Sequence, residues 1–133
     1  MTNELSESLE DYLETILALQ TKNTVARSKD IAHKMDIKRG SVTGMLKKLE
    51  AQGFINYEPY GYVTLTPSGE KIAREIENRH IMLKDFLFRI LGVEETIAND
   101  TACRMEHAMD RNTFKKFKHF ISIVDACPHH KKG

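Results

Sequence analysis

Three short clusters of metal-type side chains stand far apart in this chain of 133 residues. They hold, in order, Asp11 with Glu14, then His80, then Cys103 with Glu106 and His107. Residues three or four apart share one face of an α-helix, so the first and third clusters could each present their donors together. Gathered around one point, the six would offer carboxylate oxygen, imidazole nitrogen and one thiolate, which can hold a divalent metal ion.

The mixture of donors limits the kind of metal. Structural zinc sites are closed sets rich in thiolate, and this set is not one. A single thiolate among oxygen and nitrogen donors suits Fe(II), and also Co(II), Ni(II) or Zn(II), whereas carboxylate and histidine alone favour Mn(II). Each cluster also has an ordinary interpretation as exposed carboxylates, a core histidine or a small buried cysteine, so the metal hypothesis depends on their joint presence.

Helices must position these clusters, and the sequence predicts a mainly α-helical chain with one small β-hairpin. Apolar residues at helical spacing predict helices over about 6–20, 28–35, 40–52, 66–91 and 94–109, and a last helix from about 112. Segments 54–57 and 62–65 are rich in strand formers and are separated by turn residues 58–61. Ser28 is expected to cap the second helix, Pro67 to open the fourth, and Gly53 and Gly92 to end the third and fourth.

Helix, short turn, helix and hairpin, in this order, form a winged helix-turn-helix, which we place in residues 1–70. We expect residues 71–126 to form a helical metal-binding and dimerisation domain, and residues 127–133 a flexible tail. Residues 22–48 hold eight Lys or Arg against Asp30 and Asp36, a net charge of +6, whereas residues 1–21 carry −5. A basic block confined to the predicted DNA reader indicates contacts with phosphate.

The helix predicted over 40–52 would enter the major groove, where base edges can be distinguished. We expect exposed residues on and before it to contact bases or phosphates. They are Arg27, Ser28, Lys38, Arg39, Ser41, Thr43, Gly44, Lys47 and Lys48. Because one small module buries little surface, we expect a homodimer on double-stranded operator DNA.

Other features of the chain narrow the class of function. No apolar run is long enough to cross a bilayer, and the N-terminus lacks the pattern of a signal peptide, so we expect a cytoplasmic protein without a membrane partner. Two cysteines, Cys103 and Cys127, are too few for a disulfide framework. The sequence has no HExxH motif, Gly-rich phosphate loop or nucleophile elbow, so we expect neither an enzyme nor a small organic substrate.

Several motifs resemble the diphtheria toxin repressor family of metal-dependent transcriptional regulators, in its short form without an SH3-like domain. They are residues 10–16 (EDYLETI), 30–32 (DIA), 41–43 (SVT), 65–69 (LTPxG), 79–80 (RH) and 102–107 (ACRxEH). The resemblance covers about residues 5–125. It implies a homodimeric repressor that binds operator DNA when loaded with Fe(II) or Mn(II) and controls metal-ion homeostasis.

The resemblance further implies that the six residues named first are the metal ligands. Cys103 matches the iron branch of the family, which puts Fe(II) first. Asp11 and Glu14 resemble the manganese branch, which puts Mn(II) next, with Zn(II), Co(II) or Ni(II) as surrogates. Lys84 and Asn99 stand where the iron branch has ligands of an ancillary site, so that site is expected to be absent.

Several alternatives remain open at this level. Two ions could share Glu106, one held by Asp11, Cys103 and His107 and the other by Glu14 and His80. The chain could instead be a winged-helix regulator that senses redox state through a cysteine, or one that senses an organic ligand. The tail residues Cys127, His129 and His130 could bind a further metal ion.

Overall fold

The computed structural model describes residues 7–126. The chain divides into two compact units, a winged-helix unit that ends at Glu75 and a helical unit that begins at Ile76. The predicted fold class, mainly α with a small β-sheet, is confirmed. The domain boundary predicted between residues 70 and 71 stays a prediction, and the predicted tail lies outside the described residues. Within residues 7–126, no helix combines the length and the apolar character that a membrane crossing requires.

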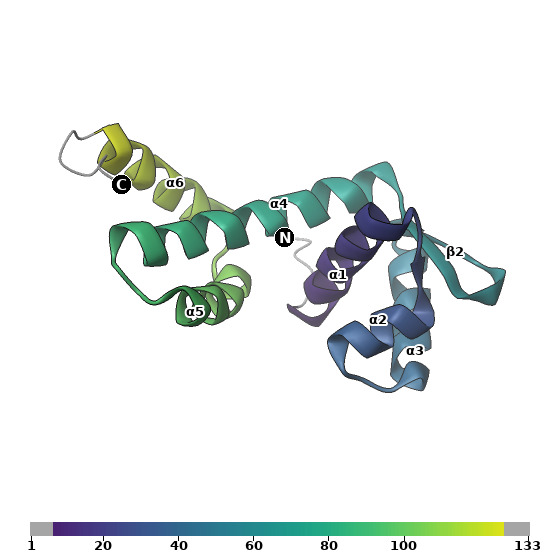
Figure 1. Cartoon of the computed structure of the whole chain (residues 1–133). Helices are drawn as coiled ribbons and strands as arrows, with labels where there is room; N and C mark the ends of the chain where they lie inside the picture. Colours follow the sequence, from purple (N-terminus) through teal and green to yellow (C-terminus); the bar gives the residue numbers. More distant parts are fainter. Residues whose placement is uncertain (1–6, 127–133) are drawn as a thin grey trace. The chain divides into compact units, whose positions relative to one another are not determined.

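Apart from the strand β1, the elements of the winged-helix unit follow the predicted order (Figure 1). They are α1 (Glu7–Asn23), β1 (Ala26–Arg27), α2 (Ser28–Met35), α3 (Arg39–Ala51), β2 (Ile55–Glu58) and β3 (Tyr62–Leu65). A 3₁₀ turn over Pro59–Gly61 joins β2 to β3. The chain leaves α2 through Asp36, whose φ of 58° breaks the helix, and leaves α3 through Gly53, whose φ of 82° suits glycine. Both breaks lie where the sequence predicts them.

The strand β1 is an element that the sequence analysis missed. It pairs antiparallel with β3, through Ala26 with Val63 and Arg27 with Tyr62, and makes the sheet order β1-β3-β2. Two residues are too short for an alternating pattern, so only pairing with β3 reveals this strand. The prediction that Ser28 caps α2 is wrong for the same reason. Arg27, held extended by β3, takes the cap position, and the Ser28 hydroxyl donates to the Gly61 carbonyl oxygen at 3.4 Å.

The core of the winged-helix unit consists of apolar side chains from its three helices and its sheet. Its fully buried members include Leu13, Ile16, Ile31, Val42, Leu46, Leu49 and Val63. Burial of such side chains contributes about 1.5–3 kcal/mol each, which holds α1 and α3 in place. Gly69, near the start of α4 (Pro67–Asp85), lies so close to the hairpin that an added Cβ would stand 1.9 Å from the Phe54 carbonyl oxygen.

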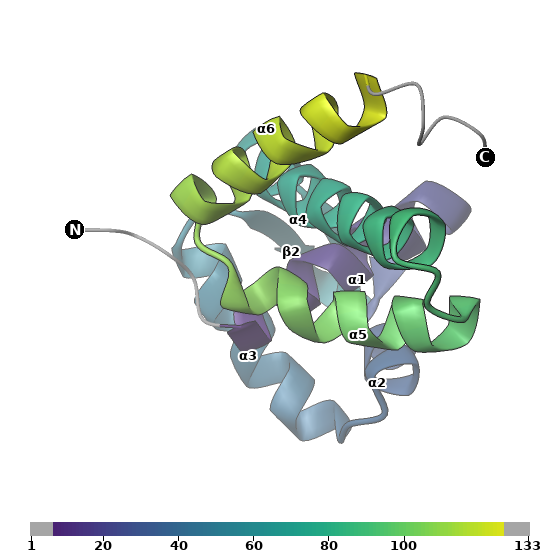
Figure 2. The same cartoon turned by 90° about the vertical axis from the view of Figure 1, so that its left-hand side faces the viewer.

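The helical unit contains the second part of α4, then α5 (Glu95–Ala108) and α6 (Arg111–Ala126). Within this unit α4 lies between α5 and α6 (Figures 1 and 2). Its core joins Leu83 and Leu87 to two alanines of α5, and the rings of Phe86 and Phe117 pack edge to face at 5.1 Å. The regular helix predicted to residue 91 is only partly right. From Phe86 to Ile90 the chain forms a π-helical turn, η2, which has no periodic signature in so short a segment.

Candidate functional site

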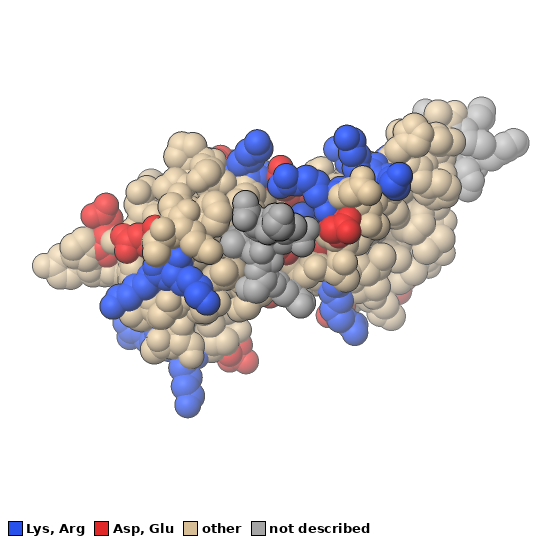
Figure 3. Space-filling model, turned by 180° about the vertical axis from the view of Figure 1, so that it is seen from behind, with Lys and Arg blue, Asp and Glu red and all other residues tan. Residues whose placement is uncertain are grey.

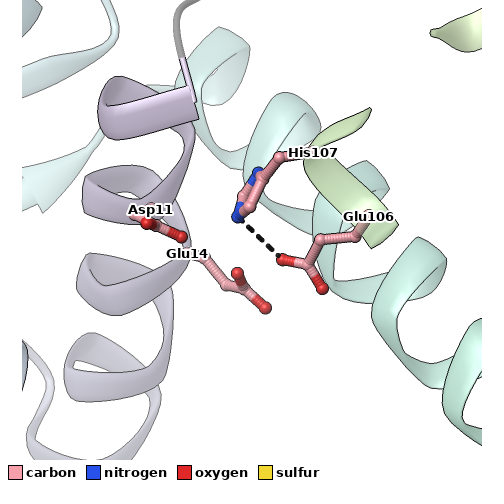
Figure 4. A group of neighbouring side chains, drawn as sticks. All are labelled: Asp11, Glu14, Glu106 and His107. Atoms are coloured by element: carbon pink, nitrogen blue, oxygen red, sulfur yellow. Dashed lines mark ion pairs between the residues drawn. The ribbon is translucent and has the colours of Figure 1, made fainter. Parts of the chain in front are cut away.

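The winged-helix unit supplies one pair of carboxylates. Asp11 and Glu14 stand one turn apart on α1, and Figure 4 shows both groups projecting from the same side of the helix. Between them Tyr12 and Leu13 are buried, at 2% and 0% exposure, and fix the rotation of α1. Burial raises the pKa of the Tyr12 phenol. The two carboxylates are partly buried, and each offers an oxygen within 4.8 Å of the other's.

The helical unit carries a second cluster, centred on the fully buried Glu106 of α5. Its Oε1 lies 2.8 Å from Nδ1 of His80 on α4. Its Oε2 lies 3.3 Å from Nε2 of His107, the contact that the dashed line in Figure 4 marks. The side chain of His107 is only 3% exposed. A 2.8 Å contact between a ring nitrogen and a carboxylate oxygen needs a shared proton, which either His80 or Glu106 carries when no cation is bound.

One oxygen of this cluster is unsatisfied. Glu106 Oε2 is buried, and within residues 7–126 it has no hydrogen-bond partner, because the His107 contact is close enough for an ion pair but poorly aligned. Leaving such an atom buried and unpaired costs about 1–3 kcal/mol. Native proteins keep such atoms where function requires them. A carboxylate oxygen beside two imidazoles fits a divalent cation, so the residues present suit the metal that the sequence predicts.

Two further residues support this cluster. Arg79 is buried, and its guanidinium donates to the carbonyl oxygens of Glu106 at 3.0 Å and Met109 at 3.4 Å, which holds the last turn of α5. The amide oxygen of Asn99 accepts from His80 Nε2 at 2.9 Å. Neither residue is predicted from the sequence to support the site: Arg79 has no predicted role, and Asn99 only marks a departure from the iron branch. The available signal was the spacing from Asn99 to Glu106, two helical turns that place both on one face of α5.

The outer side of His80 borders a hollow of about 400 Å³ on the helical unit. Lys84, Glu95 and Asn99 contribute polar groups to its lining. The Lys84 ammonium lies 3.5 Å from the Glu95 carboxylate. The two positions that depart from the iron branch are therefore engaged with neighbours in the same unit, Lys84 with Glu95 and Asn99 with His80.

Cys103 behaves differently from the other predicted ligands. It is exposed on α5, and its sulfur, like the ring nitrogens of His80, is not in the group that brings donor atoms of Glu106 and His107 within 4.8 Å of each other. The structure thus pairs Asp11 with Glu14 and clusters His80, Glu106 and His107, each within its own unit. The assignment of all six as metal ligands stays a prediction.

Seven of the nine residues predicted to contact DNA are exposed, and Ser28 and Thr43 are partly buried. Arg39 is the first residue of α3, and its carbonyl accepts from the Thr43 hydroxyl at 3.3 Å. Nothing lies within 4 Å of a Cβ built at Gly44, so the surface there is open. The Arg27 guanidinium lies over the Tyr62 ring, 5.1 Å from its centroid. Figure 3 shows several Lys and Arg side chains gathered on the lower part of this unit, at the left of the view.

Comparisons with known proteins agree with this fold. Residues 4–63 match the model of the N-terminal DNA binding domain of iron dependent repressors, and residues 66–133 match the metal binding and dimerisation domain of the same family. An uncharacterized HTH-type transcriptional regulator of Methanocaldococcus jannaschii is 39% identical over 118 residues, which are 88% of this chain and 94% of the relative. The regulator MntR of Lysinibacillus sphaericus is 37% identical over 122 residues, 91% of this chain and 86% of the relative.

Solved structures give the same result. The crystal structure of T. acidophilum IdeR matches with a TM-score of 0.74 and 27% identity, over 96% of this chain and 59% of that one. A manganese-dependent transcriptional repressor in complex with manganese matches with a TM-score of 0.73 and 28% identity, over 89% of this chain and 51% of that one. The present chain therefore spans little more than half the length of these two structures.

The fold and the matched domains define a DNA-binding transcriptional regulator with a metal-binding and dimerisation domain. The chain belongs to the diphtheria toxin repressor family of metal-dependent transcriptional repressors. The predictions of the family, of a winged-helix DNA-binding protein and of a regulator rather than an enzyme are confirmed.

Proposed function

We propose that this protein is a metal-activated repressor that binds operator DNA as a homodimer and controls genes of metal-ion homeostasis. The observation that carries the proposal is Glu106, a fully buried carboxylate between two histidines, one of whose oxygens has no hydrogen-bond partner in the described part of the chain. Such a group is costly unless a cation completes it. The relatives named MntR and the manganese complex of a similar repressor support the same conclusion.

We propose Asp11, Glu14, His80, Glu106 and His107 as the residues that hold the ion. The exposure of Cys103 leaves a donor set of carboxylates and imidazoles, which favours Mn(II). We therefore place Mn(II) first and Fe(II), which the family resemblance put first, second. The bound ion would supply the positive charge that lets several carboxylates approach one another.

The proposed switch follows from the origin of these residues. Asp11 and Glu14 belong to α1 of the winged-helix unit, whereas the three other residues belong to the helical unit. Without a cation the carboxylates repel one another, and the two units are less constrained. Shared ligation would tie α1 to α5 and so restrict the range of distances between the two α3 helices in a dimer. Couplings of this kind are typically about 1–3 kcal/mol, or roughly 5- to 150-fold in DNA affinity.

The proposed dimer uses apolar side chains of the helical unit that have no cover within the described chain. Residues at least half exposed there include Ile81, Phe88, Leu91, Ile97, Phe120 and Ile123. Exposed apolar groups in this number on one small unit indicate a protein interface. The matched family domain is described as a dimerisation domain, which supports a second copy of this chain as the partner. Sedimentation as a monomer at micromolar concentration would contradict this part of the proposal.

The test is a comparison of DNA affinity with and without metal. Duplexes are first selected from a randomised pool with Mn(II)-loaded protein, and one is then titrated by fluorescence anisotropy under anaerobic conditions. We expect Mn(II) or Fe(II) to raise the affinity by at least fivefold over protein in chelator, the lower end of such couplings. Equal affinity in Mn(II), Fe(II) and chelator would refute the switch.

A further inference from the structure

His80 is held at both of its ring nitrogens by the same helix. Nδ1 contacts Glu106 at 2.8 Å and Nε2 contacts the Asn99 amide oxygen at 2.9 Å. Asn99 and Glu106 both lie on α5, two turns apart, while His80 lies on α4. All three residues are in the helical unit, so the arrangement does not depend on the winged-helix unit.

The chemistry of the amide decides which nitrogen carries a hydrogen. An amide oxygen only accepts, so Nε2 must be the N–H donor in the contact with Asn99. In a neutral ring the lone pair then lies on Nδ1, the nitrogen that faces the buried carboxylate. A neutral imidazole can bind a metal ion only through its unprotonated nitrogen, so the Asn99 contact makes Nδ1 the metal-facing atom.

The two sides of the ring also differ in their surroundings. Glu106, on the Nδ1 side, is fully buried, whereas Asn99, on the Nε2 side, is exposed beside the hollow described above. Water could therefore reach Nε2 if the amide were removed, but water can donate as well as accept. Only an acceptor fixed at this point keeps the hydrogen on Nε2 and holds the angle of the ring.

We propose that Asn99 is a positioning residue that fixes the Nε2–H tautomer of His80 and so presents Nδ1 to the ion beside Glu106. This role rests on the proposed metal site. Partners that orient a metal-binding histidine typically change metal affinity by about 10- to 100-fold when they are removed. The solvent access at Asn99 places the expected loss at the lower end of this range, about tenfold.

The test compares Asn99→Leu, which removes the acceptor at similar size, with Asn99→Asp, which keeps an acceptor. Asn78→Leu is the matched control, because Asn78 is an exposed asparagine of α4 whose amide contacts a methionine sulfur at 3.9 Å. Mn(II) affinity is measured from the free-ion EPR signal. We expect Asn99→Leu to lose about tenfold in affinity, and Asn99→Asp and Asn78→Leu to stay within about threefold of wild type.

A second readout separates positioning from a merely structural tie between α4 and α5. Zn(II)-loaded protein with ¹⁵N-labelled histidine reports by NMR which nitrogen of His80 carries the proton, with His80→Gln used for assignment. We expect Nε2–H in wild type and in Asn99→Asp, and a mixture of tautomers or weak loading in Asn99→Leu. A structural tie would lower thermal stability without changing the tautomer.

The outcomes separate the two proposals. Wild-type affinity for Mn(II) in Asn99→Leu, or an unchanged tautomer, would overturn the role of Asn99 and leave the metal site standing. Wild-type protein that binds neither Mn(II) nor Zn(II) would overturn the proposed metal site, and the role of Asn99 with it.

Discussion

Glu106→Gln should make the metal-free protein more stable while it removes the response to metal. In wild type, no group of residues 7–126 forms a hydrogen bond with the buried Oε2 of Glu106, at a cost of about 1–3 kcal/mol. Glutamine can donate an amide N–H to the lone pair of His80 Nδ1, now 2.8 Å from Oε1, and places its oxygen near His107 Nε2, now 3.3 Å from Oε2. It also removes a buried negative charge. We expect a gain of about 1–2 kcal/mol in the free energy of unfolding.

The assay is urea denaturation in chelator and in excess Mn(II), followed by circular dichroism. Ligand at one hundred times its dissociation constant stabilises a protein by about 2.7 kcal/mol. Wild type should gain about this amount from Mn(II), and Glu106→Gln little. The order of stability is therefore expected to invert: the variant is more stable in chelator, and wild type is more stable in Mn(II).

Glu95→Gln, an exposed glutamate of the same helix, serves as the control and should change stability by less than about 0.5 kcal/mol in either condition. A Glu106→Gln protein less stable than wild type in chelator would refute the reasoning. It would mean that the buried carboxylate gains more from its histidines than it loses through the unsatisfied oxygen.

Three further changes test other parts of the structure. Lys47, an exposed residue of α3, is expected to contact a phosphate, so Lys47→Ala should make the negative slope of log affinity against log salt shallower by about 0.9 for operator DNA. Lys71→Ala on α4 should leave this slope unchanged. Equal slopes for wild type and Lys47→Ala would show that Lys47 does not contact the DNA. Gly69→Ala should lower the free energy of unfolding by about 3 kcal/mol or more in a thermal melt, because the added Cβ would overlap a backbone carbonyl. Gly40→Ala, with open space around its Cβ, should raise the free energy of unfolding by up to about 1 kcal/mol. Glu94 caps the start of α5, where its carboxylate accepts from the backbone N–H groups of Thr96 and Ile97, and these donors lower its pKa. Its contribution to stability is therefore complete above about pH 4.5 and is lost as the pH falls through the lower pKa of the folded state. Glu94→Gln should flatten the curve of stability against pH in that acidic range, and parallel curves for wild type and variant would contradict the cap.

Much of the fold follows from local sequence. The helices α1 to α6 and the strands β2 and β3 lie within a few residues of their predicted positions, except that α4 ends at Asp85 and the π-helical turn η2 replaces its predicted last turns. Apolar periodicity and turn residues act over one or two turns of chain. The missed element, β1, and the wrong cap at Ser28 have one cause. Both depend on pairing with β3, more than thirty residues later in the chain.

The candidate site likewise has features that follow from local spacing and features that depend on packing. The spacing of Asp11 with Glu14, and of Glu106 with His107, already places each pair on one helical face. Spacing also suggests Cys103 as a neighbour of that second pair, but its exposure depends on how α5 packs in the helical unit. The three-residue step from Cys103 to Glu106 places both residues on the same side of the helix, to within about the width of one side chain. Whether each is buried depends on which part of that side the neighbouring helix covers.

The sequence alone determined the kinds of donor available, the helices that carry them and the basic block of the DNA reader, because these are properties of composition and local periodicity. Tertiary structure alone decided that Glu106 is fully buried with one oxygen unsatisfied, and that His80 is held between Glu106 and Asn99. The physical reason is distance along the chain. His80 lies 19 and 26 residues from its two partners, so only the packing of α4 on α5 brings these atoms within hydrogen-bond reach.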